Sequence, residues 1–579
     1  MEDSNLKAAS AISSTSAARV LNVGLLLAIL ALLATKLQLL STLNINWDEF
    51  LFASKIYAFE RGELTSQLQS FHVHLFGWIR SAGNNGVDQI IAAREFMFGL
   101  RLLTCACIFL IGRRLFGTTG ALVAVAASMA FSYVIMHGES FRADPLITSC
   151  FMVAASLLIL FPARMLATVT AGVLMAVAAM ISIKAAIYGP SIAILLLINW
   201  RTAEESRGAV LRASIGFCVA SGIALLGLYL AHQASLGTAP AYELTDKLSD
   251  TGTRMWAPPP SGTFTLTYNW DRTWWMLTAL GGLAAIGVML KAPHRRTGLI
   301  VLAMMLPLTT LSFYRNSFPY YYICLIPPAS LAIGLLASLA PRVLPNRPAL
   351  AAIIVGLAVL LAGTRTVRLI GLNNDDTVTP QRRVLAAVKR LFPEPVPYID
   401  RCSMVVDYPK LGIFMSTLVS GVYRERGAPV MQSLVESRQP PFILENSPGL
   451  NLSLSVEQIA ASPYRLLPED HLYLQKHYLR YWGPIHLAGR QFESTDGQAH
   501  SFELPVAGPY SVIAENAIAI DGQTLEPGAV IDLEAGQHTL QGPAGGNRVI
   551  LRYGRALPQP EGPPLPRGMF TGLGFRNFP

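Results

Sequence analysis

The sequence predicts a multi-pass α-helical membrane protein with a C-terminal extracytoplasmic part that combines an α/β unit with a β-sandwich. Three observations predict this class. Of the 579 residues, 52% are apolar and only 14% are charged, whereas soluble domains carry about 25% charged residues. Apolar runs long enough to cross a bilayer recur up to residue 365. Short alternating runs broken by Gly and Pro fill the end of the chain.

The apolar runs predict about eleven transmembrane helices, each of about 20 residues. Some of the apolar runs are short or share a border, so the number of spans could differ from eleven by one or two. The first run follows an acidic start without a clear cleavage site, and we interpret it as an uncleaved span. The expected spans are 20–41, 92–112, 116–136, 145–161, 165–183, 185–200, 213–232, 274–290, 298–313, 320–340 and 348–364.

The loops between these spans alternate in charge. With the N-terminus in the cytoplasm, every inner loop is basic, as the positive-inside rule requires. The outer segments then hold most of the acidic residues, and the long C-terminal part lies outside the membrane. We therefore expect a membrane protein whose C-terminal part is extracytoplasmic; in a bacterium it would lie in the inner membrane with this part in the periplasm. The basic inner segments are Arg113–Arg114, Arg164, 201–212, 291–296 and 342–347.

Charge and cysteine patterns exclude two classes of protein. The net charge of +9 is spread along the chain, and no Lys/Arg block with interleaved aromatic residues is present, so nucleic acid is not an expected partner. The six cysteines lack zinc-finger spacing, and most lie in apolar runs as small buried hydrophobic residues would.

The domain boundaries follow changes in composition. We expect a membrane domain at 1–365, a linker at 366–395, an α/β subdomain at 396–485 and a β-sandwich-like subdomain with an extended tail at 486–579. Asp521-Gly522 marks a two-residue hairpin turn. The tail could hold substrate, cover an active site, or only support the membrane part.

Carboxylates gather in the outer segments, where membrane proteins rarely place them without a function. Asp48 and Glu49 follow the first span, and Glu139 and Asp144 lie in the second outer loop. A carboxylate pair can accept a proton from a hydroxyl group or bind a divalent cation such as Mg²⁺ or Mn²⁺, with Asp48 and Asp144 as ligands. Asp144, which precedes Pro145, could also simply cap a helix, and Asp48 could be a solvated loop residue.

Basic side chains in the same outer segments could bind a phosphate group, because arginine can donate two parallel hydrogen bonds to it. Lys184 lies between two apolar runs, so its side chain could instead extend to the membrane–water interface and bind no phosphate. The candidate cations are Arg142, Lys184, Arg254, Arg272 and Arg315.

Several motifs together resemble the GT-C-fold glycosyltransferases that use polyprenyl-phosphate donors, a group that includes the aminoarabinose transferase of lipid A and the protein O-mannosyltransferases. The resemblance extends over 1–365 in its order of spans and loops. Two features depart from the family pattern: His72 and its neighbours replace the Lys/His-Pro-Pro of the first loop, and Arg315 stands where relatives usually have Lys. The motifs that carry the resemblance are Trp47-Asp48-Glu49, QSFHVHLFGWIR at 69–80, SFRADP at 140–145 and FYRNSFPYYY at 313–322.

The resemblance implies a transfer of sugar from a polyprenyl-phosphate carrier to an acceptor hydroxyl, with a lipid, glycan or protein as acceptor. Asp48 would be the general base of a single, inverting displacement, with Glu49 and Asp144 as further catalytic candidates. The donor phosphate would be held by Arg142, Lys184, Arg315 and Tyr320. The substrate cleft would be lined by His72, His74, Glu139, Tyr321 and Arg254.

Some assignments have alternatives. His72 and His74 share a face on a strand but not on a helix, so they could form a metal pair or line the cleft. Residues 320–322 could be an interfacial aromatic belt. A flippase for lipid-linked sugars, a surface-polysaccharide polymerase or ligase, and a non-enzymatic scaffold are the competing functions. The transferase requires residues 48, 144 and 315 to converge on one cavity.

Overall fold

The computed structural model divides the chain into two compact units, which we call the helical unit and the C-terminal unit. The helical unit comprises Met1–Thr42, Phe59–Arg80 and Ile91–Asn374, and the C-terminal unit comprises Leu43–Ala58, Ser81–Ile90 and Asp375–Pro579. The structure describes residues 2–570 except 204–205, 237–260, 344–355, 360–377, 414, 416, 463, 494–496, 545–547, 556, 559, 561–564 and 566–568.

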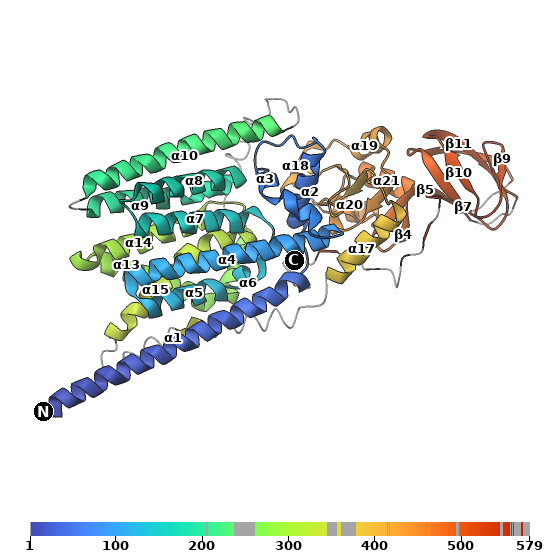
Figure 1. Cartoon of the computed structure of the whole chain (residues 1–579). Helices are drawn as coiled ribbons and strands as arrows, with labels where there is room; N and C mark the ends of the chain where they lie inside the picture. The colour runs from blue at the N-terminus through green and yellow to red at the C-terminus, as the bar shows by residue number, and fades with distance from the viewer. Residues whose placement is uncertain are drawn as a thin grey trace. The chain divides into compact units, whose positions relative to one another are not determined.

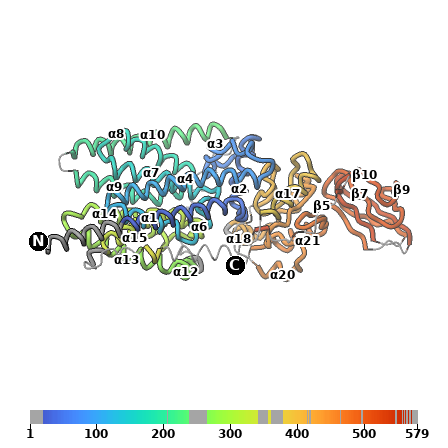
Figure 2. The backbone as a smooth tube through the Cα atoms, turned by 60° about the horizontal axis from the view of Figure 1, so that its bottom comes forward, coloured from blue at the N-terminus to red at the C-terminus, as the bar shows by residue number. Residues whose placement is uncertain are grey.

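Long helices lying side by side make up the helical unit (Figures 1 and 2). α5 packs against α15 and α1, while α8 packs between α7 and α10. The helices are α1 (Glu2–Thr42), α3 (Val73–Phe76), α4 (Gly86–Phe116), α5 (Thr118–Ala130), α6 (Ser132–His137), α7 (Ala143–Leu160), α8 (Met165–Ile181), α9 (Gly189–Thr202), α10 (Arg207–Ser235), α12 (Ser261–Trp270), α13 (Arg272–Met289), α14 (Arg295–Met305) and α15 (Tyr322–Val343).

The multi-pass helical class is confirmed, but the count of eleven spans is not. Within the described residues, six helices are long and apolar enough to cross a membrane, and a bent pair over 272–312 would be a seventh. The pair is bent by 120° between α13 and α14. The predicted spans at 116–136 and 165–183 correspond to the shorter apolar helices α5 and α8. Most of the predicted span at 348–364 lies outside the described residues.

Close helix contacts in this unit depend on glycine. A Cβ atom added to Gly120 of α5 would lie 2.6 Å from the carbonyl oxygen of Gly334 in α15, and one added to Gly334 would lie 2.5 Å from the oxygen of Gly120. The two backbones therefore touch at a point where only hydrogen atoms fit. Small residues at helix crossings are the usual means of tight packing where lipid removes the hydrophobic driving force between helices.

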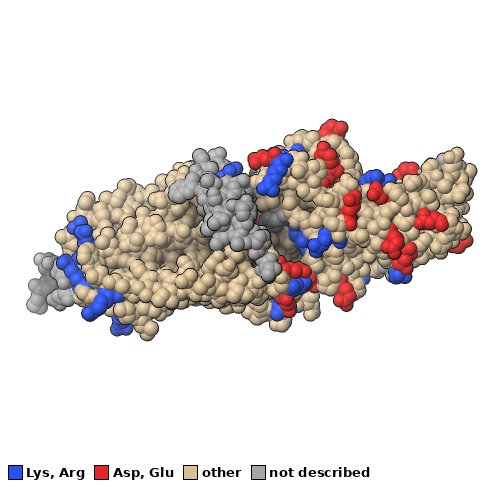
Figure 3. Space-filling view, turned by 90° about the horizontal axis from the view of Figure 1, so that it is seen from above, with Lys and Arg blue, Asp and Glu red and all other residues tan. Residues whose placement is uncertain are grey.

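The two ends of the helical unit differ in charge. Lysine and arginine gather at one end of an otherwise mostly uncharged surface, whereas the C-terminal unit shows both signs (Figure 3). Arg296 donates hydrogen bonds to the Ile159 carbonyl (3.3 Å) and to Asn199 (3.2 Å). Arg296, in the predicted inner loop 291–296, thus contacts the ends of α7 and α9, and each of these helices leads into another predicted inner loop.

The C-terminal unit is built on two β-sheets, counted over the described residues. One has eight strands in the order β10-β7-β12-β5-β3-β1-β2, with β4 paired to β5; the other has the order β6-β11-β8-β9. Only the β2-β1-β3 pairs are parallel. The strands are β1 (Tyr398–Asp400), β2 (Lys410–Leu411), β3 (Phe442–Leu444), β4 (Tyr478–Trp482), β5 (Ile485–Phe492), β6 (Ala499–Leu504), β7 (Gly508–Ile513), β8 (Ile518–Ile520), β9 (Gln523–Leu525), β10 (Val530–Leu533), β11 (Gly536–Gln541) and β12 (Val549–Tyr553).

Helices accompany the first strands of this unit, as the alternating pattern predicted. The sequence EDHLYLQKHYLRYW at 469–482 predicts a single helix, and this prediction is corrected: the helix ends at His477, and Tyr478–Trp482 form β4, which pairs with β5. The helices are α2 (Trp47–Glu60), α17 (Val378–Leu391), α18 (Thr417–Arg426), α19 (Met431–Arg438), α20 (Val456–Ala460) and α21 (Pro468–His477).

The end of the chain has the layered core of a sandwich. Buried side chains from both sheets, such as Leu504, Val512 and Leu540, form one hydrophobic cluster. Asp521 and Gly522 have φ values of 49° and 82° between β8 and β9, which is the two-residue hairpin turn that the sequence predicts. The first sheet is continuous through β5, at the point where the sequence analysis placed a subdomain boundary.

Candidate functional site

Four of the predicted site residues meet at one end of the helical unit. Asp144 accepts a hydrogen bond from Lys184 Nζ at 2.7 Å and lies 3.4 Å from Arg142 Nε. The ring of Tyr320 lies 3.6 Å from the guanidinium carbon of Arg142 and 4.8 Å from Lys184 Nζ. We call Arg142, Asp144, Lys184 and Tyr320 the ionic cluster.

Local structure positions each member of the ionic cluster. Asp144 is in the first turn of α7, where its carboxylate faces Lys184 instead of capping the helix. The Ser182 hydroxyl accepts a hydrogen bond from the Lys184 backbone N–H at 3.3 Å and so caps the 3₁₀ helix η2 (Ile183–Tyr188). Tyr320 follows Pro319 in the 3₁₀ helix η5 (Pro319–Tyr321). Asp144 is therefore more than a helix cap, and Lys184 does not simply extend toward the membrane interface, because the two side chains form an ion pair.

The ionic cluster carries a net positive charge. It combines two cations with one carboxylate, and the exposed fractions of the Arg142, Lys184 and Asp144 side chains are 10%, 13% and 2%. Buried charges interact more strongly than solvated ones because the local dielectric is low. The cluster is therefore suited to an anion that Arg142 and Lys184 can reach together.

A second buried ionic group lies in the same unit and was missed by sequence reasoning. Glu139 pairs with Lys36 of α1 and lies 3.4 Å from Arg101 Nε of α4. All three side chains are at most 5% exposed. The sequence could have indicated this group, because Lys36 and Arg101 interrupt apolar spans and charged residues inside such spans usually have a function. Glu139, predicted to line the substrate cleft, thus has two buried cations as partners.

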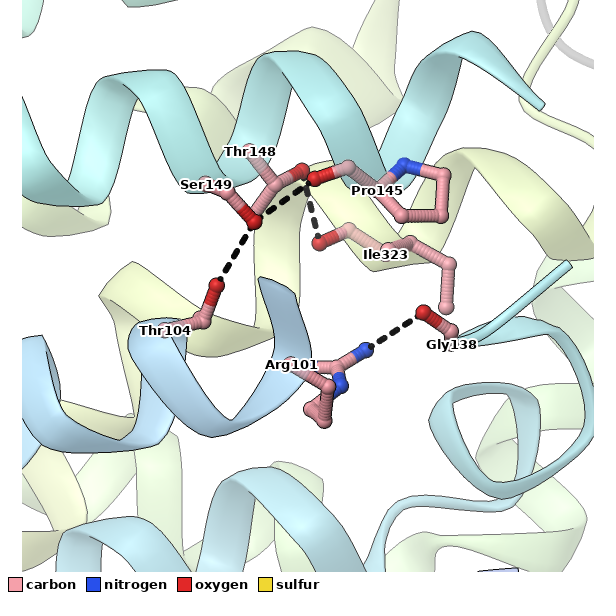
Figure 4. Close-up of a pocket in the computed structure, with 7 residues that line it drawn as sticks. All are labelled: Arg101, Thr104, Gly138, Pro145, Thr148, Ser149 and Ile323. Carbon is pink, nitrogen blue, oxygen red and sulfur yellow. Dashed lines mark hydrogen bonds between the residues drawn. The ribbon is translucent and has the colours of Figure 1, made fainter. Parts of the chain in front are cut away.

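Hydrogen bonds tie the surroundings of Arg101 to α7 and α15 (Figure 4). The Thr104 and Ser149 hydroxyls are 3.0 Å apart, and the Thr148 hydroxyl donates to the Ile323 carbonyl. The pocket that these residues line together with Arg101 has no room for a water molecule. It is a hydrogen-bonded packing seam that fixes α7, from which Asp144 projects.

The histidines of the first outer segment have separate neighbours. His74 Nε2 lies 2.8 Å from Nδ1 of His232 in α10, and the other ring nitrogen of His232 lies 2.9 Å from the Ser70 hydroxyl. The His72 ring packs on Phe141. His72 and His74 therefore do not form the metal pair that one interpretation allowed. The contact between His74 and His232 could not be predicted from sequence spacing, because the two residues are far apart in the sequence.

The late aromatic segment is mostly interior. Tyr321 and Tyr322 are fully buried, and the Tyr321 hydroxyl lies 2.6 Å from the Thr310 hydroxyl. An interfacial aromatic belt is therefore not what this segment forms. Arg315 is exposed on the loop before it. Arg254, another predicted cleft residue, lies outside the described residues.

Asp48 lies in the C-terminal unit, at the start of α2. Asn46 caps α2, since its Oδ1 accepts a hydrogen bond from the Asp48 N–H, and Glu49 Oε1 accepts one from the Asn46 N–H, both at 3.0 Å. Glu49 is fully buried, whereas Asp48 is half-buried. The hydrogen bond to Asn46 explains Glu49 and leaves Asp48 as the accessible carboxylate of the pair. The predicted convergence of residues 48, 144 and 315 stays a prediction.

Asp144 does not fit the metal site that was predicted for it together with Asp48. Both carboxylate oxygens of Asp144 face Lys184 and Arg142, whereas Mg²⁺ and Mn²⁺ need oxygen ligands. The described residues contain no group of three or more His, Cys, Asp or Glu side chains that could hold an ion. We therefore derive no chemical step through a metal.

Comparisons with known proteins agree with this architecture. A sequence profile of the dolichyl-phosphate-mannose-protein mannosyltransferase family matches residues 75–242, which is less than half of the chain. No curated protein sequence matches. ArnT from Cupriavidus metallidurans, solved with bound undecaprenyl phosphate, is 14% identical with a TM-score of 0.52, over 74% of this chain and 94% of that chain.

An oligosaccharyltransferase from Archaeoglobus fulgidus is similar in two further structures. AglB in complex with an inhibitory peptide and a dolichol-phosphate is 11% identical with a TM-score of 0.54, over 90% of this chain and 95% of that chain. The complex with Zn and sulfate is 12% identical with a TM-score of 0.52, over 89% and 94%. At such low identity the likeness shows the fold. It confirms the GT-C resemblance expected from the sequence and a multi-pass membrane architecture.

Proposed function

We propose that this chain is a membrane glycosyltransferase that moves a sugar from a polyprenyl-phosphate carrier to an acceptor hydroxyl on the extracytoplasmic face. The observation that carries the proposal is the net positive ionic cluster at the end of the helical unit. Arg142 and Lys184 would hold the donor phosphate, and Tyr320 would pack beside it. The GT-C fold and the lipid phosphates bound by similar structures support the same donor class.

The proposed reaction is a single displacement at the anomeric carbon of the sugar. Asp48 accepts the proton of the acceptor hydroxyl while the hydroxyl oxygen forms a bond to that carbon. The bond between the carbon and the phosphate oxygen breaks, and polyprenyl phosphate leaves with the electron pair. Arg142 and Lys184 offset the negative charge that grows on the leaving phosphate. One displacement of this kind inverts the anomeric configuration.

The other predicted site residues have different roles in the proposal: some support the site, some are candidates for substrate contact, and some have no substrate contact assigned. Asp144 keeps the two cations in place, and Arg315 is a further candidate for the phosphate because it is exposed. His72 and His74 remain candidates for the substrate cleft. We assign no substrate contact to Glu49, Glu139 and Tyr321, because their polar groups have buried partners in the fold.

The base assignment is tested with Asp48→Asn. Purified protein in nanodiscs is incubated with a panel of polyprenyl-phosphate sugars and candidate acceptors, and released polyprenyl phosphate and glycosylated product are quantified. We expect Asp48→Asn to lower kcat by about 10²–10⁴-fold, the usual contribution of general base catalysis. Asp88→Asn is the control, because Asp88 is an ion-paired carboxylate of the same unit; it should keep wild-type kcat. A wild-type rate in Asp48→Asn contradicts the base role.

The phosphate assignment is tested with Lys184→Met in the same assay. We expect the KM for the lipid donor to rise about tenfold or more, because a hydrogen bond to a charged group contributes about 1.5–3 kcal/mol. Arg296→Met, which removes a cation from the other end of the helical unit, should leave this KM unchanged. An unchanged donor KM in Lys184→Met would contradict the proposed site. Transport of labelled carrier across a liposome bilayer, with no glycosylated product, would favour a flippase.

A further inference from the structure

The segment that carries Asp48 is held by the C-terminal half of the chain. Gln381 of α17 accepts a hydrogen bond from the Ile45 N–H (3.0 Å) and donates one to the Ile45 carbonyl (2.9 Å). The Asn44 side chain donates to the Met569 carbonyl at 3.0 Å. These contacts fix the chain immediately before α2 and therefore the position at which Asp48 begins the helix.

Arg401 is the charged residue that the C-terminal half brings to this segment. Its guanidinium carbon lies 4.1 Å from the centre of the Trp47 ring, in a cation–π contact. Its charge interacts with that of Asp48, the residue next to Trp47. Arg401, Trp47 and Asp48 are all half-buried, so each keeps part of its surface open to a substrate.

The loop that presents Arg401 is unusually constrained. The buried Asp400 carboxylate accepts hydrogen bonds from the backbone N–H groups of Cys402, Ser403 and Met404 at 2.8–3.0 Å. Asn446 donates to Asp400 at 3.0 Å and accepts from the Arg401 N–H at 3.2 Å. These hydrogen bonds fix the backbone of the turn and therefore the direction in which the Arg401 side chain leaves it.

Backbone strain points to the same loop. Ser403 has a φ of 65°, in the left-handed region that residues other than glycine rarely adopt. Such strain persists where the surrounding structure enforces it and is frequent at functional sites. Arg401 Nη1 also donates to the Ser447 hydroxyl at 3.3 Å, which directs the guanidinium further.

We infer that Arg401 is a positioning residue for Asp48, and that through it the C-terminal half of the chain takes part in the transfer step. This inference rests on the proposed function, in which Asp48 is the general base. The guanidinium attracts the Asp48 carboxylate and limits where its oxygens can lie. A fixed base keeps the geometry that proton transfer requires, and displacement by about 1 Å can lower a rate on the order of a hundredfold.

The test measures kcat, KM and folding for variants of Arg401. We expect Arg401→Ala to lower kcat about tenfold to a hundredfold, with the donor KM unchanged and the melting temperature near that of wild type. Arg401→Lys should recover part of the rate because it restores the charge. Millimolar guanidinium chloride should raise the rate of Arg401→Ala but not that of Asp48→Asn, because only the first retains the base.

Arg383→Ala is the matched control, since Arg383 also lies over a tryptophan of the same unit, Trp482, at 5.7 Å. It should change neither kcat nor the response to guanidinium. If Arg401→Ala keeps wild-type kcat while Asp48→Asn loses it, the inference about Arg401 is overturned and the proposed function stands. If Asp48→Asn also keeps its rate, the base assignment itself fails. If Arg401→Ala does not fold, Arg401→Gln and Arg401→Lys are compared in its place, and equal kcat for these two overturns the inference.

Discussion

Single charged residues in this protein work in small compensated groups. Glu139 balances Lys36 and Arg101 in the helical unit, and Asp144 balances Arg142 and Lys184. Both groups keep one positive charge in excess. In the ionic cluster that excess charge would attract an anion, and in the group around Glu139 removal of the carboxylate would leave two buried cations without a counter-ion.

The carboxylate of Glu139 is therefore expected to be a stability determinant. Glu139→Gln leaves two cations without their counter-ion, which typically destabilises a protein by about 3–5 kcal/mol. Thermal unfolding in one detergent, followed by circular dichroism, should show a clearly lower melting temperature. The double variant Lys36→Met/Glu139→Gln should recover part of the loss. Glu63→Gln, which removes an exposed pair with Arg61, should change stability by at most about 1 kcal/mol; equal losses for Glu139→Gln and Glu63→Gln would contradict the assignment.

At the scale of elements, two kinds of contact position the chemistry. A hydroxyl–hydroxyl hydrogen bond joins α4 to α7 near Arg101, a hydroxyl–carbonyl bond joins α7 to α15, and together they hold the start of α7. The glycine contact between α5 and α15 brings these two helices to backbone distance. The 3₁₀ helix η5, which supplies Tyr320, leads directly into α15, so the packing of α15 affects the position of Tyr320 in the ionic cluster.

The α5–α15 contact should tolerate no added side chain. Gly334→Ala places a methyl group against the Gly120 carbonyl, and such overpacking costs about 1–3 kcal/mol. Gly227→Ala in α10 is the control, because nothing lies within 4 Å of its added Cβ atom. Alanine also favours a helix over glycine by up to about 1 kcal/mol, so the control should be neutral or slightly stabilised. The melting temperatures of the two variants decide the matter, and a neutral Gly334→Ala contradicts the close contact.

At the scale of the whole molecule, the positions of the basic loops indicate which end of the helical unit faces the cytoplasm. Arg296, Asn199 and the end of α7 meet at one end of the helical unit. The ionic cluster joins the predicted outer loop 137–144 and the predicted outer turn at Lys184 with Tyr320, the first residue of the predicted span 320–340. This grouping is what the positive-inside rule requires of a protein whose inner loops share the cytoplasmic face.

The positive-inside rule predicts the orientation of the molecule from that grouping. Alkaline phosphatase fused after residue 579 should be active in intact cells, because we expect the C-terminal unit to be extracytoplasmic. The same enzyme fused after residue 203, in a predicted inner loop, should be inactive. The reverse pattern of activities would show that the chain is inverted and would place the proposed reaction on the cytoplasmic side.

Sequence by itself determined the class of protein, because hydrophobic length, turn residues and loop charges are local signals. The Asp521-Gly522 hairpin and the shared end of Arg142, Asp144 and Lys184 both followed from such signals. Tertiary structure decided which charges meet. Lys36 with Glu139, His74 with His232 and Arg401 with Trp47 join residues far apart in the sequence, and no spacing rule links them. It also decided that Glu49 is buried, with its carboxylate bound to the Asn46 N–H, while Asp48 is half-buried, because burial depends on the neighbours that folding supplies.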